Sequence, residues 1–166
     1  MKYLKRFNET IAYHGKKNNI MLSMDDIGKT STYFYLTPNY GYALEYSNQK
    51  SKDNVFKFDI DESKLLDLRS LGIKRYKFSE LRKKFNDLTK LFWPLQFQQL
   101  YSWTRRVDDM ALWEWIRHDT DGIIRKIIEK AGYDGILLQE ERFDRGFESI
   151  VLFNAEPIRN KKAIFN

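Results

Sequence analysis

Two residues that could take part in chemistry stand near opposite ends of the chain. His14 lies in "YHG", between Tyr13 and Gly15, where a short β-prone run gives way to a polar, basic loop. Glu148 begins the apolar run "ESIVLF", where a carboxylate is unusual unless it stands at the mouth of a strand. At a strand edge that faces a cleft, it can stabilise a developing positive charge or hold a sugar hydroxyl. Both residues also have an ordinary interpretation, because single histidines are often structural and acidic residues often begin strands.

Tyrosines form the third group of candidates. Residues 32–37, "TYFYLT", should form a strand, because aromatic and β-branched residues favour strands. Side chains alternate across a strand, so Tyr33, Phe34 and Tyr35 cannot all point into the core. Tyr42 and Tyr46 stand four residues apart and share a face if their segment is helical. Burial in the core is the ordinary interpretation of such rings, and contact with a ligand is the alternative.

The remaining chemistry is limited by what the chain lacks. It has no cysteine, which excludes disulfides, thiolate metal ligands and a cysteine nucleophile. Its second histidine, His118, reads as a capping or surface residue, so we expect no metal site. No apolar run approaches the ~20 residues that span a bilayer, and the charged start "MKYLKRFNET" does not read as a secretory signal. We therefore expect a cytoplasmic protein without membrane contact.

The elements that must position these residues follow a simple order. Strands are expected at 9–13, 32–37, 54–60, 133–139 and 147–154, with a short helix in "NYGYALEYSN". Between them, residues 79–131 read as helical. Leu81, Phe85, Leu88, Leu91 and Phe92 fall on one stripe, and a last helix begins near Thr120 and stops at Gly132. Strands, a helical middle and strands again predict an α+β fold in a single domain, residues 1–166.

Charge points to anionic partners. The 166 residues carry a net charge of +6, with a pI of about 9.3. The positive residues are clustered, at Lys16-Lys17, Lys74-Arg75-Lys77, Arg82-Lys83-Lys84, Arg105-Arg106 and Arg159-Lys161-Lys162. A solvated, mildly basic surface is the ordinary interpretation of most of these residues.

Taken in order, the motifs resemble those of the ADP-ribosyltransferase family. "YHG" resembles the first strand of that family, and "TYFYLTPNYGYALEYS" resembles its second motif: an aromatic strand, a threonine or small residue, then a short helix with alanine and tyrosine. "GYDGILL" and "FESIVLFNAEPIR" resemble its closing strands, with the catalytic glutamate opening the last but one. Histidine at the first motif is similar to the branch that contains diphtheria toxin and the poly(ADP-ribose) polymerases. The resemblance covers residues 9–60 and 131–160.

This resemblance implies split antiparallel sheets with a helical insertion, and a site for NAD as co-substrate. His14 would hold a ribose hydroxyl of NAD, and the backbone of Gly15 would grip the nicotinamide amide. Tyr35 would pack on the nicotinamide, with Tyr46 or Tyr42 as a second stacking ring. Glu148 would hydrogen-bond the nicotinamide ribose and stabilise the oxocarbenium-like transition state.

The implied activity is transfer of ADP-ribose from NAD to a macromolecular acceptor, a protein or a nucleic acid, by a monomer that releases nicotinamide. Arginine-modifying members carry Gln or Glu two residues before the catalytic glutamate. Gly146 stands there in this chain, so arginine is not the expected target.

A second hypothesis is that the protein is not an enzyme. The middle of the chain interleaves tryptophans with basic residues, a combination that can stack bases and neutralise phosphates. These residues are Trp93, Trp103, Trp113 and Trp115 with Arg82, Lys83, Lys84, Arg105 and Arg106. The alternative is therefore a non-catalytic nucleic-acid-binding or structural module that retains the fold.

Overall fold

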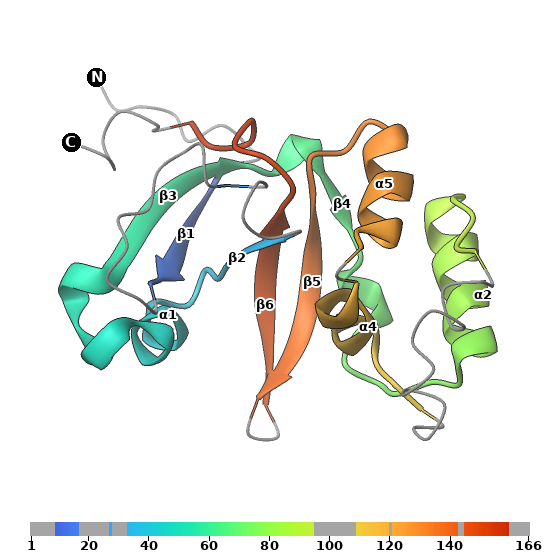
Figure 1. Ribbon diagram of the computed structural model, residues 1–166, viewed down its shortest axis with the longest axis horizontal. Coiled ribbons are helices and arrows are strands. Elements are labelled where there is room, and N and C mark those ends of the chain that lie inside the picture. Colours follow the sequence, from blue (N-terminus) through green and yellow to red (C-terminus); the bar gives the residue numbers. More distant parts are fainter. Residues whose placement is uncertain are drawn as a thin grey trace.

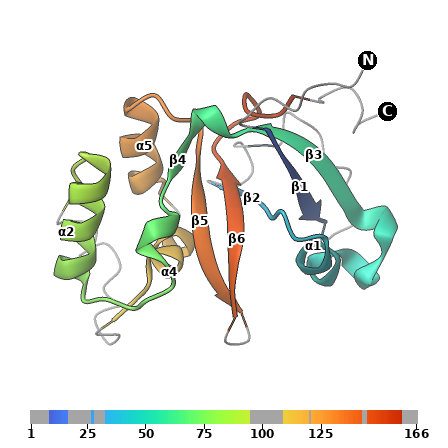
Figure 2. The same cartoon turned by 180° about the vertical axis from the view of Figure 1, so that it is seen from behind.

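Three layers make up the part of the chain that the computed structural model describes, which is residues 9–16, 27, 33–94, 109–119, 121–142 and 145–159. A two-stranded sheet packs on one face of a four-stranded sheet, and helices cover the other face (Figure 1). The view from behind shows the same order of layers (Figure 2). The chain is therefore α+β, as its sequence predicts.

The smaller sheet pairs strand β1 (Glu9–Gly15) with β3 (Val55–Asp61) in antiparallel register. Ala12 lies opposite Phe58, and both are fully buried against the larger sheet. Both strands were predicted, but β1 runs two residues further than expected. Its last two residues are His14 and Gly15, so the candidate histidine belongs to the strand and not to the loop after it.

The larger sheet has the order β2-β6-β5-β4. Its strands are β2 (Phe34–Leu36), β6 (Arg145–Leu152), β5 (Gly135–Arg142) and β4 (Leu65–Asp67). β6 is antiparallel to both of its neighbours, but β4 runs parallel to β5. The expectation of split antiparallel sheets therefore fails at this edge alone, where β4 and β5 are parallel. β4 was also not predicted, because three residues are too few to show a strand periodicity.

Alternation along β6 gives the larger sheet two different faces. Ile150 and Leu152 pack between the two sheets, whereas Val151 packs under the helices. By the same period of two, Glu148 lies on the face toward the smaller sheet, and Phe147 and Ser149 lie on the face toward the helices. This division decides which candidate residues can meet.

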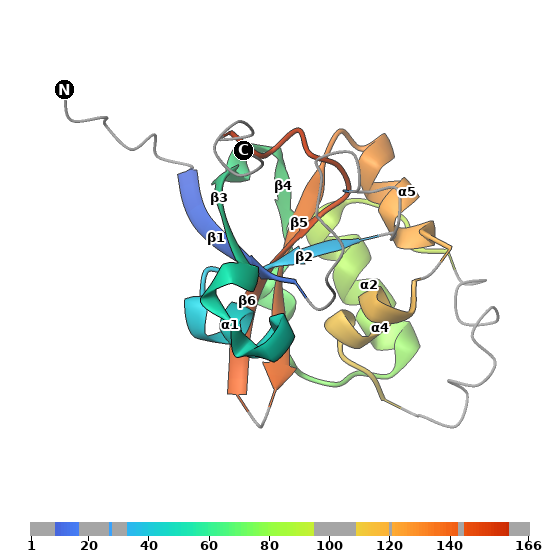
Figure 3. The same ribbon diagram turned by 60° about the vertical axis from the view of Figure 1, so that its left-hand side comes forward.

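Four α-helices are described, together with four short 3₁₀ turns. The helices are α1 (Tyr40–Tyr46), α2 (Phe78–Thr89), α4 (Leu112–His118) and α5 (Ile123–Lys130). The turns are η2 (Asn48–Lys50), η3 (Lys52–Asn54), η4 (Glu62–Lys64) and η5 (Arg69–Leu71). Helix α1 lies beside the end of β1, apart from the others (Figure 3).

The helical middle differs from the expected pattern at its ends. Leu81 and Phe85 of α2 are buried as predicted, but Leu88 is 44% exposed and Phe92 is 67% exposed. The helix ends at Thr89 because Lys90 adopts a left-handed conformation (φ 60°), so Phe92 leaves the helical phase. The predicted continuation "LQFQQLYSW" lies outside the described residues.

Helix α5 begins close to the predicted position. The proposed cap Thr120 lies outside the described residues, but the buried Asp119 carboxylate accepts hydrogen bonds from the N–H groups of Ile123 (2.8 Å) and Ile124 (2.9 Å). The Tyr33 hydroxyl donates to the same carboxylate, which joins the residue just before β2 to the start of α5. Gly132 follows the helix with φ 97°, as its predicted role as a stop requires.

Among the described residues, no helix has the length and apolarity that a membrane span requires.

Candidate functional site

His14 is held in one orientation by two contacts with β2. Its ring stacks on that of Phe34, with centroids 4.3 Å apart and planes 27° apart. Its Nδ1 lies 2.8 Å from the carbonyl oxygen of Tyr35, and since a carbonyl can only accept, Nδ1 carries the proton. Burial lowers the pKa of His14, although the bond to the carbonyl opposes this shift. The ring is therefore neutral near pH 7, and Nε2 is an acceptor.

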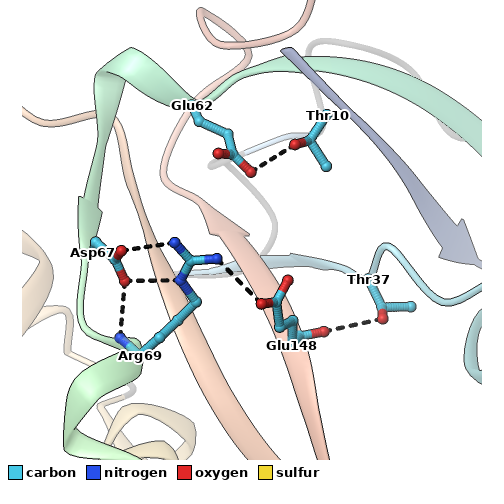
Figure 4. A network of polar contacts seen from close by, with 6 residues as sticks. All are labelled: Thr10, Thr37, Glu62, Asp67, Arg69 and Glu148. Carbon is cyan, nitrogen blue, oxygen red and sulfur yellow. Dashed lines mark hydrogen bonds and ion pairs between the residues drawn. The ribbon is translucent and has the colours of Figure 1, made fainter. Parts of the chain in front are cut away.

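Glu148 stands in the middle of β6 and remains 46% exposed. Its carboxylate accepts a hydrogen bond from Nη1 of Arg69 (3.1 Å), and its backbone carbonyl accepts one from the Thr37 hydroxyl (3.0 Å), as Figure 4 shows. The glutamate was expected to open the last strand but one. Instead β6 begins three residues earlier and is the last strand of the described residues, because the hairpin with β5 pairs as far as Arg142 and Arg145.

Arg69 is itself fixed by a neighbouring carboxylate. Its Nε and Nη2 donate to Asp67 over 2.9 Å and 2.8 Å, and its backbone N–H donates to the same side chain over 3.0 Å. These hydrogen bonds lower the pKa of Asp67 and raise that of Arg69. A bidentate pair of this kind has a defined geometry. It leaves Nη1 of Arg69 directed at Glu148.

Thr37 joins the strand of the histidine to the strand of the glutamate. Its backbone exchanges two hydrogen bonds with Tyr13, of 2.8 Å and 2.9 Å, and its hydroxyl donates to the Glu148 carbonyl. Tyr13 precedes His14, and Thr37 is 7% exposed. On β1, His14 shares the face of the buried Ala12, which is the face toward the larger sheet. His14 and Glu148 therefore both lie on the inner faces of the two sheets, on strands that Thr37 connects.

Gly15 has a packing role that the sequence did not show. A Cβ atom at this position would stand 1.9 Å from the carbonyl oxygen of Ala43 and 2.9 Å from the backbone nitrogen of Ser47. The close approach that glycine permits is thus to helix α1 and its C-terminal end. This contact explains the glycine without a ligand.

Tyr35 does not join His14 and Glu148 through its side chain, which corrects the expected triad. Tyr35 lies opposite Val151, so its ring packs under the helices, on the face of the sheet opposite to Glu148. Burial raises the pKa of Tyr35, and the nearby charge of Glu140 adds to this shift. Within the described part of the chain, the Tyr35 hydroxyl has no hydrogen-bond partner. What Tyr35 offers the site is its backbone carbonyl.

The tyrosines of α1 are placed differently. Tyr42 stacks on Phe147, the residue before Glu148, with centroids 4.3 Å apart and planes 26° apart. Tyr46 lies one helical turn further and is half-buried. Because α1 packs on the end of β1, these rings stand near the ends of both strands that carry candidate residues. By alternation, however, Phe147 lies on the face of β6 opposite to Glu148, so the stacking contact of Tyr42 is on the same side of the sheet as the ring of Tyr35. What brings α1 near the site is its packing beside β1.

Thr37, Asp67 and Arg69 were not predicted as site residues. Thr37 had a signal, since the second motif includes a threonine or small residue after the aromatic strand. Asp67 and Arg69 had none, because Arg69 is 79 positions from Glu148 and only the sheet brings them together. No group of three or more potential metal ligands occurs among the residues described.

Comparison with known proteins gives this site no precedent, since no family model, no curated protein and no solved structure matches the chain.

Proposed function

We propose that the protein transfers ADP-ribose from NAD to a macromolecular acceptor and releases nicotinamide, as the histidine-containing ADP-ribosyltransferases do. One observation carries the proposal. Thr37 connects the strand of His14 to the strand of Glu148, with both residues on the inner faces of two sheets and with the tyrosine helix α1 at their ends. The order of the motifs along the chain also supports the proposal, in addition to this arrangement in space.

The residues suit the reaction. When the bond between the nicotinamide nitrogen and the ribose carbon breaks, its electron pair passes to the nicotinamide ring, which leaves uncharged. Positive charge then develops on the ribose, and the Glu148 carboxylate stabilises it. An acceptor nucleophile bonds to the same carbon and loses a proton. Nε2 of the neutral His14 accepts a hydrogen bond from a ribose hydroxyl, a role that a doubly protonated ring could not fill.

The roles within the site differ from those that the sequence implied. Tyr46 of α1 takes the place of Tyr35 as the ring for the flat nicotinamide, since the ring that Tyr42 stacks on, Phe147, lies on the face of β6 opposite to Glu148. Tyr35 is a positioning residue, since its carbonyl fixes the tautomer of His14. Arg69 fixes one oxygen of Glu148, which leaves the second oxygen for the ribose.

The test is nicotinamide release from NAD by the wild type and by Glu148→Gln, which keeps the shape of the side chain and removes its charge. Glu156→Gln is the matched control, because it removes an exposed carboxylate from the loop after β6. We expect Glu148→Gln to lose about a hundredfold or more of the rate and the control to keep it. Equal turnover by both variants would disprove the role of Glu148.

The acceptor is found with labelled NAD and a cell lysate. Treating the labelled products separately with protease and with nuclease distinguishes a protein acceptor from a nucleic acid. Label that survives both treatments as free ADP-ribose would show hydrolysis in place of transfer.

A further inference from the structure

The net charge of the chain is concentrated in one short stretch. Residues 74–90 contain seven lysines and arginines and only two carboxylates, a net charge of +5 out of the +6 of the whole chain. This stretch consists of α2 and the segment that leads into it. The rest of the protein is nearly neutral, so the basic balance belongs to residues 74–90 and not to the surface in general.

Aromatic rings lie among these charges. The ammonium groups of Lys74 and Lys84 stand 5.1 Å and 5.2 Å from the centre of the same ring, that of Tyr76. The guanidinium of Arg82 stands 4.5 Å from the ring of Phe92, which is the most exposed large apolar side chain described. In the described part of the chain, neither Lys74 nor Lys84 has an ion-pair partner. We name Lys74, Tyr76, Arg82, Lys84 and Phe92 the α2 surface.

The α2 surface is separate from the candidate site. Figures 1 and 2 show α2 at one end of the molecule, beyond α4 and α5, and the sheet of β1 and β3 at the other. Of the other charged groups in residues 74–90, Arg75 pairs with Glu114 and Lys83 pairs with Asp87. Lys77, Lys90 and Glu80 have no ion pair with another described residue, and together they add one further positive charge. Uncompensated positive charge therefore remains at the α2 surface, beside rings that water can reach.

We propose that the α2 surface binds single-stranded nucleic acid. Phosphates would neutralise the lysines, which releases counterions, and bases would stack on the exposed ring of Phe92 and on the half-buried ring of Tyr76, as they do in proteins that bind single strands. A protein partner fits less well, because the centres of protein interfaces are poor in lysine. A duplex also fits less well, because its bases are stacked on each other and leave no face for Tyr76 or Phe92.

The proposal is tested by fluorescence anisotropy with a labelled single-stranded oligonucleotide of mixed sequence, without NAD, over a range of salt concentrations. The first variant is Lys74→Glu/Lys84→Glu. Its matched control is Lys52→Glu/Lys57→Glu, which makes the same change of net charge at exposed positions near the other end of the molecule. The second variant is Phe92→Ala, which removes an exposed ring and leaves the charge unchanged.

We expect the first variant to weaken binding about tenfold or more, Phe92→Ala to weaken it roughly fivefold, and the control to change it little. Affinity should fall steeply with salt. Equal losses in the first variant and the control would overturn the proposal, since the attraction would then be general. Equal binding of a duplex of the same sequence, or of polyglutamate, would overturn it as well. Because NAD is absent, the outcome is independent of the proposed transferase activity.

Discussion

Nη1 of Arg69 donates a hydrogen bond to the carboxylate of Glu148 over 3.1 Å, while the other side of the same guanidinium is held by Asp67. The three charged groups form a line from β4 to β6 across the inner face of the larger sheet (Figure 4). Side chains of Arg69 and Glu148 are 35% and 46% exposed, so this pair adds little to the stability of the fold. Its effect is on the orientation of Glu148.

Replacing Arg69 should therefore affect the reaction more than the fold. We expect Arg69→Ala to lower the rate of nicotinamide release roughly tenfold and to leave the melting temperature nearly unchanged. The rate in Arg69→Lys should be close to that in Arg69→Ala, because an ammonium group cannot pair with Asp67 in bidentate fashion. The control is Arg159→Ala, which removes another partly exposed partner of a carboxylate, Asp61. If kcat is the same in Arg69→Ala as in the control, the hydrogen bond from Arg69 does not contribute to the role of Glu148 in the reaction.

The buried His14 should make stability depend on pH. Its pKa in the folded protein lies below the value of about 6.5 in an unfolded chain. The unfolded state therefore binds more protons between these two values, and the free energy of unfolding rises with pH across that window. Above pH 6.5 or so the contribution is complete, and it is lost as pH falls toward the folded pKa.

This pH dependence is measured by urea denaturation at a series of pH values. His14→Asn, which can still donate to the carbonyl of Tyr35, should show a shallower slope than the wild type. His118→Asn is the comparison, because the pKa of His118 is also lowered, mainly by burial. If the slope disappears in His118→Asn and persists in His14→Asn, the pH dependence of stability comes from His118, and the prediction for His14 is wrong.

Gly15 should tolerate no side chain. A Cβ atom 1.9 Å from the carbonyl oxygen of Ala43 forces β1 and α1 apart, and we expect Gly15→Ala to cost about 1–3 kcal/mol of the free energy of unfolding. Gly41→Ala is the matched control within α1, where the added atom meets only the side chain of Asn39 at 3.2 Å. Helix propensity should make that variant neutral or slightly more stable. Equal stability of the two variants would mean that the strand and the helix are not in the close contact described.

Thr37→Val should show whether Thr37 positions Glu148 for the reaction or only stabilises the fold. The substitution keeps the shape of the side chain and removes the hydroxyl that donates to the Glu148 carbonyl, with an expected loss of about 1 kcal/mol. Thr89→Val removes a comparable hydroxyl, which donates to the Phe85 carbonyl in α2. Both variants should lose similar stability, but only Thr37→Val should lower nicotinamide release. Equal activity of the two would show that Thr37 holds the strands together without serving the site.

Much of the fold could be predicted because its elements carry local signals. The alternation of β3, the apolar runs of β5 and β6 and the helical period of α5 are visible in the sequence, and Gly132 on its own marks the end of a helix. β4 and the early end of α2 could not be predicted in this way. A strand of three residues acquires its conformation from the neighbour it pairs with, and the turn at Lys90 has no glycine or proline to announce it.

The candidate site was predictable only in part, for a related reason. His14 and Glu148 stand out because a polar residue interrupts an apolar pattern. Tyr35 could not be assigned to a face, because alternation fixes faces only once the strand register is known, and the register comes from pairing with β6. The tryptophans of the second hypothesis illustrate the same limit. Trp93 and Trp115 are core residues, while Trp103, Arg105 and Arg106 lie outside the described residues.

The parallel pairing of β4 with β5 has a consequence for how this protein can change. Leu65 lies opposite Gly135, so the chain that leaves β4 returns, after its helices, to the adjacent position in the same sheet. The whole interval from 68 to 134 is thus a detour with neighbouring entrance and exit, and α2 belongs to it. Arg69 lies in η5, at the very start of this detour. An engineer can therefore exchange helices beyond Leu71 while Arg69 and the strands of His14 and Glu148 keep their places.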